Sequence, residues 1–203
     1  MFTRWHVPVI DLRFPCKVPS KKGYARTECC TGIGDRALLS KKRTALFCSR
    51  QCPGSLILCA HEWAKRCTRH EAVIVSGFHT PVEQECLRLF LRRGQPVIVC
   101  PARGLNHFRI PAAYRDPLIA GTLLLLSPFD GTIRRVTRAH AARRNAWVAA
   151  LAHQVVFIHA ALGSQTEQLF RNTLAKGKRC FTFDHPANEH LITAGADPLE
   201  SAC

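Results

Sequence analysis

Short apolar runs recur along this chain, and each ends in small, polar or glycine residues before a segment of helical character. Strands of a parallel sheet read as unbroken apolar runs when helices cover both faces of the sheet. This repeated pattern between Thr44 and Ala196 constrains the fold more than any single motif does. We expect strands at residues 44–48, 72–75, 97–100, 122–126, 155–158 and 179–183.

The segments between these runs carry apolar residues at helical spacing. Gly94, Gly121 and Gly177 each precede the next run, as the C-terminal cap of a helix would. Alternating strands and helices imply right-handed crossovers and parallel pairing. The sequence therefore predicts one α/β domain over residues 36–203, with an open, mainly parallel sheet and helices on both faces. The expected helices are 54–67, 81–91, 138–151, 167–174 and 187–193.

The first 35 residues show no regular period. They contain three prolines and a cluster of basic residues at 17–26. Prolines and glycines without periodicity are typical of irregular chain. We expect residues 1–35 to form an irregular basic N-terminal arm, with one edge strand at 7–12.

The net charge of +15 is the unusual feature of the composition. Lys and Arg exceed Asp and Glu both in the first 50 residues and in the remainder. An excess spread over the arm and the fold favours a polyanionic partner, although a solvated basic surface also explains it.

Eleven cysteines raise the question of zinc or disulfides. No Cys-x-x-Cys pair occurs, whereas structural zinc needs two paired sets of ligands. Several cysteines close apolar runs, where a reduced thiol acts as a small apolar side chain. We expect reduced cysteines, no metal site and a cytoplasmic location. No apolar run approaches the ~20 residues of a membrane helix, so no membrane partner is expected.

Candidate binding residues stand where the expected strands end. Ser49 and Arg50 follow the first strand and precede a helix start, where backbone N–H groups and a guanidinium favour a phosphate. Ser76 and Gly77 follow the second strand, and glycine lets a backbone approach a ligand closely. A surface arginine on a tight loop is the plain alternative for Arg50.

Further candidates follow the same logic. Phe78 offers a face on which a base could stack, although it could equally fill the core, and His79 lies beside it. Arg103 could supply a second phosphate contact after the third strand. The pair Arg144 and Asn145 lies beside apolar residues and so could point inward, although a basic run is usually a solvated helix face.

A loop of small residues closes the fifth strand and opens a helix. Gly163, Ser164 and Thr166 would expose backbone N–H groups there and form an anion nest. Glycine-serine turns are common, so this pattern is weak in isolation.

Taken together, these residues resemble the DprA/Smf family of DNA-processing proteins. The family's Gly-Ser-Arg corresponds to residues 48–50, and its Ser-Gly to Ser76 and Gly77. Its Arg-Asn pair corresponds to residues 144–145, and its Ser-Gly-Ser…Thr loop to residues 163–166. The resemblance extends from roughly residue 32 to residue 198. The family's closing Gly-Ala corresponds to residues 195–196.

The resemblance implies an extended Rossmann-like fold whose strand-end loops hold single-stranded DNA. It also implies a homodimer and a RecA-type recombinase that family members load onto DNA, with roles in recombination, DNA uptake and transformation. Two positions depart from the family pattern, since residues 80–83 replace Gly-Ile-Asp and Ala146 replaces the second arginine of Arg-Asn-Arg. The chain resembles a compact, single-domain branch, for which we expect DNA binding ahead of recombinase loading.

Two other functions stay open. Phosphoribohydrolases of the same superfamily carry Pro-Gly-Gly-x-Gly-Thr-x-x-Glu, but here Glu167 directly follows Thr166. Glu83 and Glu167 are the candidate catalytic carboxylates, and a cap at a helix start explains both equally. The other alternative is a sensor of a nucleotide-derived ligand. We favour a non-enzymatic DNA-binding protein without a cofactor.

Overall fold

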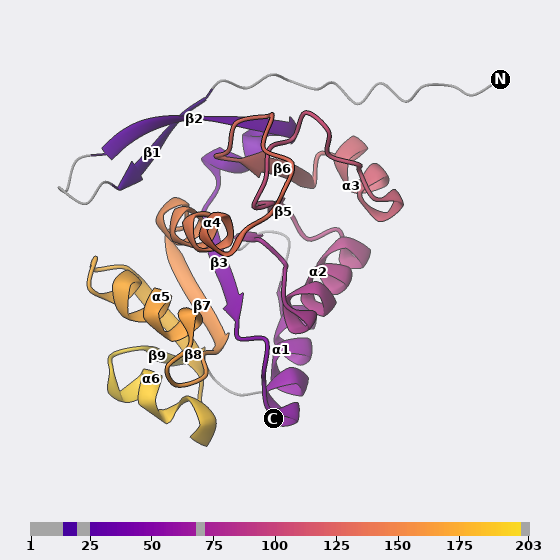
Figure 1. Ribbon diagram of the computed structural model, residues 1–203. Helices are drawn as coiled ribbons and strands as arrows, with labels where there is room; N and C mark the ends of the chain where they lie inside the picture. Colours follow the sequence, from indigo (N-terminus) through magenta and orange to yellow (C-terminus); the bar gives the residue numbers. More distant parts are fainter. Residues whose placement is uncertain (1–13, 20–24, 68–71, 200–203) are drawn as a thin grey trace.

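The computed structural model describes residues 14–19, 25–67 and 72–199 (Figure 1). The strands within these ranges are β1 (Phe14–Pro19), β2 (Ala25–Gly34), β3 (Arg43–Cys48), β4 (Val73–Ser76), β5 (Val97–Val99), β6 (Leu123–Ser127), β7 (Gln154–His159), β8 (Arg179–Phe183) and β9 (Asp197–Leu199). The α-helices are α1 (Gly54–Arg66), α2 (Pro81–Arg93), α3 (Arg115–Ile119), α4 (Arg138–Leu151), α5 (Gln165–Leu174) and α6 (Glu189–Thr193).

The strands form one sheet in the order β1-β2-β6-β5-β4-β3-β7-β8-β9. Neighbouring strands are parallel from β6 through to β9, whereas β2 is antiparallel to β6 and β1 is antiparallel to β2. The chain builds outward from β3 to β6 and then returns to place β7 on the other side of β3. The sheet therefore has a topological switch point between β3 and β7, outside whose carboxyl ends a ligand crevice is expected.

Two apolar layers sandwich the sheet, because alternate residues of each strand point to opposite faces. In β3, Leu46 belongs to the apolar layer that includes residues of α1, α2 and α3, and Phe47 belongs to the layer that includes residues of α4, α5 and α6. Figure 1 shows α1 and α2 on one side of the sheet and α4 and α5 on the other. The structure is thus a Rossmann-like α/β fold with helices on both faces, as the sequence predicts.

The strands follow the unbroken apolar runs closely. All six strands expected between residues 44 and 183 are present with ends shifted by at most two residues, and α4 has the predicted bounds. Gly94 ends α2 in a left-handed conformation, with φ of 63°. The last expected helix is split, since a 3-10 turn at Pro186–Asn188 precedes α6.

The expected irregular arm contains regular structure in its described part. β1 and β2 pair with each other, and residues 31–34 of β2 pair with β6. The prediction that residues up to 35 are irregular is therefore wrong for β1 and β2. Pairing with the apolar strand β6 orders β2, although the sequence of β2 has no period of its own. The edge strand expected at 7–12 lies outside the described residues.

The described cysteines depart from the expectation at Cys59. Cys59 is disulfide-bonded, contrary to the reduced state expected throughout. Cys48, Cys52, Cys86 and Cys180 are free thiols. Within the described ranges, no group of three or more His, Cys, Asp or Glu side chains is arranged to hold a metal ion. The described helices include none with the length and apolar character needed to cross a membrane.

Candidate nucleic-acid interface at the carboxyl ends of the strands

Ser49 joins the two loops that flank the switch point. Its backbone N–H donates to the carbonyl of His159 at 2.8 Å, and its Oγ accepts from the backbone N–H of Ala161 at 3.0 Å. The Oγ atoms of Ser49 and Ser164 are 3.3 Å apart. Because Ser49 is only 4% exposed, it fixes the β3 and β7 loops against each other and does not present its hydroxyl to solvent.

Arg50 is the exposed cation of this junction. It follows Ser49 directly and precedes α1, whose N-cap position Pro53 provides no side-chain hydrogen bond. The first-turn N–H groups of a helix attract anions when no side chain satisfies them. By contrast, Thr80, Thr137 and Ser164 cap α2, α4 and α5 with their side chains.

The loop after β4 turns sharply at Phe78. This residue has φ of 46°, a left-handed conformation that is uncommon for a large side chain, and its N–H donates to Ser76 Oγ at 3.2 Å. Its ring is 5% exposed and belongs to the core. The expected stacking role of Phe78 is therefore wrong, because the turn sends the ring inward and leaves His79 exposed on the loop.

Glu83 is the buried brace of the site. Its Oε1 accepts from the N–H of Cys48 at 2.9 Å, and its Oε2 accepts from the N–H groups of His79 at 2.8 Å and Thr80 at 3.4 Å. The side chain of Thr80 in turn accepts from the N–H of Glu83, which completes a capping box at the start of α2. A carboxylate from one helix thus holds the ends of both β3 and β4.

Arg144 reaches the same place from the opposite face of the sheet. It is 4% exposed, its Nη1 donates to the carbonyl of Cys100 at 2.7 Å, and its Nε donates to Asn145 Oδ1 at 2.7 Å. Its guanidinium fills the space that a side chain at position 77 would need, so any larger residue there would have to displace Arg144 from its hydrogen bonds. Arg144 was expected to grip phosphate directly, but the structure uses these donors to support the β4 and β5 loops.

The charges at this edge influence one another. Burial raises the pKa of Glu83, against the lowering effects of the N–H groups of His79 and Cys48 and of the Arg144 cation. Burial lowers the pKa of Arg144, while Glu83 raises it. Partial burial lowers the pKa of His79, and the positive charges of Arg144 and Arg50 lower it further. The site is therefore electropositive at its surface, with one carboxylate underneath.

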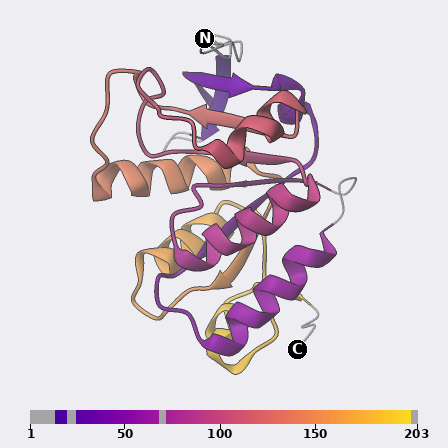
Figure 2. The ribbon, with the colours of Figure 1, turned by 90° about the vertical axis from the view of Figure 1, so that its right-hand side faces the viewer.

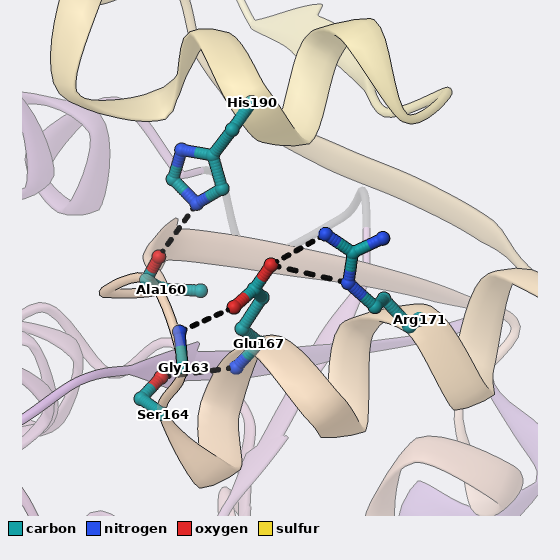
Figure 3. A network of polar contacts seen from close by, with 6 residues as sticks. All are labelled: Ala160, Gly163, Ser164, Glu167, Arg171 and His190. Atoms are coloured by element: carbon teal, nitrogen blue, oxygen red, sulfur yellow. Dashed lines mark hydrogen bonds and ion pairs between the residues drawn. The ribbon is translucent and has the colours of Figure 1, made fainter.

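The loop after β7 has a second carboxylate brace, shown in Figure 3. Glu167 Oε2 accepts from the N–H of Gly163 at 2.6 Å, and its Oε1 accepts from Arg171 Nη2 at 2.6 Å. These two groups lower the pKa of Glu167, with the Arg171 bond the larger cause. His190 Nε2 lies 2.8 Å from the carbonyl of Ala160.

The N–H of Gly163 thus already donates to Glu167 and is not open to an external anion, contrary to the anion nest expected from the sequence. Thr166 is half-buried within the first turn of α5. A hollow of about 770 Å³ lies beside this loop, and Arg171 and His190 are among its walls.

Both candidate catalytic carboxylates have these bracing roles. Glu83 and Glu167 accept hydrogen bonds from strand-end N–H groups and stand three residues after Thr80 and Ser164. The Ser/Thr-x-x-Glu spacing is a helix-start signature and could have identified them as braces from the sequence. A general acid or base must instead reach its substrate.

Arg103 lies farther along the same edge. Its guanidinium lies over the ring of Phe108, 4.9 Å from the ring centroid, and its carbonyl accepts from Ser127 Oγ at 2.7 Å. The N–H of Gly104 donates to the carbonyl of Ile133 at 2.8 Å, so the loops after β5 and β6 support each other. The structure therefore groups Ser49, Arg50, Gly77, His79, Arg144 and Ser164, and it leaves Arg103 outside this group.

Comparison with known families identifies the chain. The model of the DNA recombination-mediator protein A family matches residues 11–202. The chain belongs to this family. The resemblance to DNA-processing proteins expected from the sequence is thereby confirmed. No curated protein matches the chain.

Solved structures with the same fold include two DNA processing proteins A. The Streptococcus pneumoniae protein has a TM-score of 0.71 and 20% identity, over 85% of this chain and 63% of that one. The Helicobacter pylori protein, described for its single-stranded DNA binding mode, has a TM-score of 0.65 and 24% identity, over 84% of this chain and 81% of that one. This chain thus spans less than two thirds of the S. pneumoniae chain.

The molybdenum cofactor carrier protein of Chlamydomonas reinhardtii is also similar. It has a TM-score of 0.55 and 16% identity, over 79% of this chain and 91% of that one. Because all three identities are low, these likenesses show a common fold.

Replacing Gly77 by alanine tests the close approach of Arg144. The new methyl group would displace a buried guanidinium, so we expect a loss of about 1–3 kcal/mol in the free energy of unfolding, measured with urea. Gly54→Ala is the matched control, since nothing lies within 4 Å of a Cβ there. Equal stability of the two variants would contradict this role of Gly77.

Replacing Glu83 by alanine tests the buried brace. Three N–H groups would lose their acceptor and Arg144 its counter-charge, so unfolding should become easier by about 3–5 kcal/mol. Glu85→Ala, on the exposed side of the same helix, removes only a surface pair with Arg88 and should cost at most about 0.5 kcal/mol. A Glu83→Ala protein as stable as Glu85→Ala in urea titrations would refute the bracing role.

Proposed function

We propose that this protein binds single-stranded DNA at the carboxyl ends of β3, β4 and β7. Membership of the DNA recombination-mediator protein A family supports this, as does the single-stranded DNA binding described for the H. pylori protein of the same fold. Within the chain itself, the net charge of +15 favours a polyanionic ligand.

One observation carries the proposal. Loops from three neighbouring strands are fastened together around the switch point, and the charged side chain that they leave exposed there is the Arg50 guanidinium. Arg50 supplies a guanidinium, the uncapped start of α1 supplies N–H groups, and His79 supplies a third contact. A phosphate backbone presents the complementary charges.

The buried groups have a supporting part in this interface. Arg144 lies beneath Gly77 and adds positive potential without itself reaching solvent. Glu83 holds the loops in place from beneath the surface. The backbone that it binds lies between its carboxylate and a bound phosphate. The surface is thus prearranged before the ligand arrives, which reduces the entropy lost on binding.

Three further parts of the proposal rest on the family resemblance. We propose that the protein forms a homodimer, that it contacts a RecA-type recombinase, and that it acts in the cytoplasm. Sedimentation of the purified chain, with and without a recombinase, tests the first two directly.

Replacing Arg50 by alanine tests the phosphate contact. Affinity for labelled single-stranded DNA should fall about equally for all sequences, because phosphate contacts carry no base information. The slope of log affinity against log salt should become shallower by about 0.7, the value for one phosphate on a single strand. Arg92→Ala, at the far end of α2, has the same net charge and should keep the original slope. A change in sequence preference alone would contradict the assignment.

The protonation of His79 should make binding dependent on pH. Its pKa lies below the ordinary histidine value, so the imidazole is neutral at pH 7, and protonation adds a cation to the site at more acidic pH. We expect DNA affinity to rise severalfold between pH 7.5 and pH 5.5, and His79→Gln to remove most of that rise. His61→Gln, on α1, should retain it, and an unchanged pH profile in His79→Gln would exclude this contact.

A further inference from the structure

A second cavity lies at the opposite edge of the sheet, where the parallel strands begin. It has a volume of about 390 Å³ and lies between the end of α1 and the first residues of β3, β4 and β7. The C-terminal ends of α1 and α2, which mark this edge, face right in Figure 2. The volume is in the range of small-molecule sites, and nothing in the proposed DNA interface uses it.

Gln95 provides an unexplained polar group in the wall of this cavity. The residue is 2% exposed, and its Nε2 donates to the carbonyl of Ala72 at 2.6 Å. Its Oε1 accepts no hydrogen bond from any part of the chain that the structure describes. A buried acceptor without a donor is destabilising, so its presence calls for an N–H or O–H from elsewhere.

The rest of the lining is suited to a flat ring. Trp63 and Phe181 are aromatic, and Ile74 and Val156 are buried and aliphatic. The Oγ of Thr44 accepts from Gln154 Nε2 at 3.1 Å, and its hydroxyl keeps one donor. The cavity therefore combines an apolar slot with one acceptor and one donor.

The rim of the cavity carries an exposed cation, Lys42, in its wall. The guanidinium of Arg179 lies over the ring of Phe181, 4.7 Å from the ring centroid, but Asp197 Oδ2 neutralises it at 2.7 Å. Cations at the mouth of an apolar slot attract a ligand with an anionic tail. A flat heteroaromatic ring with a donor and an acceptor on its edge, joined to a phosphate, satisfies all of these groups.

We propose that this cavity binds a nucleoside monophosphate, with the base between Trp63 and Phe181 and the phosphate near Lys42. An N–H of the base would donate to Gln95 Oε1. The site is separate from the DNA interface, since it lies at the other ends of the same strands. The protein would then have two ligands of related chemistry at opposite edges of one sheet.

Calorimetric titration of the full chain with AMP, GMP, CMP and UMP tests the proposal. We expect at least one nucleotide to bind with Kd below about 100 μM, and the matching nucleoside and inorganic phosphate to bind at least about tenfold more weakly. Gln95→Leu should weaken that nucleotide about tenfold or more, whereas Gln84→Leu, on the exposed side of α2, should not. Lys42→Ala should reduce nucleotide affinity towards that of the nucleoside, and it serves as a second test if Gln95→Leu does not fold.

Two outcomes would overturn the proposal. One is the absence of binding by all four nucleotides at 1 mM, a concentration chosen as about ten times the expected upper limit of Kd. The other is nucleotide binding that is lost in Arg50→Ala but kept in Gln95→Leu and Lys42→Ala, which would locate the nucleotide at the DNA interface. Titration of the same variants with single-stranded DNA separates this result from the proposed function, because Gln95→Leu should bind DNA normally.

Discussion

The arrangement at the carboxyl ends of the strands depends on the buried carboxylate of Glu83. It accepts hydrogen bonds from the N–H groups that follow β3 and β4, and it lies close enough to Arg144 for the two charges to affect each other. An isolated buried charge would be costly, but N–H dipoles and a guanidinium compensate it. This compensation lets two tight loops end beside each other with their polar groups satisfied. The exposed positions of Arg50 and His79 follow from it.

A second carboxylate repeats this solution on the other side of the switch point. Glu167 holds the N–H of Gly163 and pairs with Arg171, much as Glu83 holds the loop before α2. In both cases the residue that carries negative charge is directed at the backbone and the helix start. Neither glutamate therefore places its charge on the surface beside Arg50, because each is occupied by hydrogen bonds within the protein. A strand-end site can thus attract an anion while containing two glutamates.

Much of the fold could be predicted from the sequence, since strands with both faces covered consist of unbroken apolar runs. The gathering of Ser49 and Gly77 could also be predicted, because both follow parallel strands that end at the same edge. The directions of Phe78 and Arg144 could not. The φ of Phe78 and the space left by Gly77 are set by contacts between loops that are distant in sequence. β2 was missed because its own residues show no strand period, and its partner β6 supplies the order.

The antiparallel pairing of β2 with β6 has a consequence for the sheet as a whole. β6 contains four consecutive leucines that are fully buried, and β2 lies along the side of β6 away from β5. Without β2, that side would be an open, strongly apolar ladder of unpaired backbone groups, which is the usual starting point for edge-to-edge association of proteins. The N-terminal strand β2 therefore covers an edge of β6 that would otherwise be open to pairing with a strand of another chain.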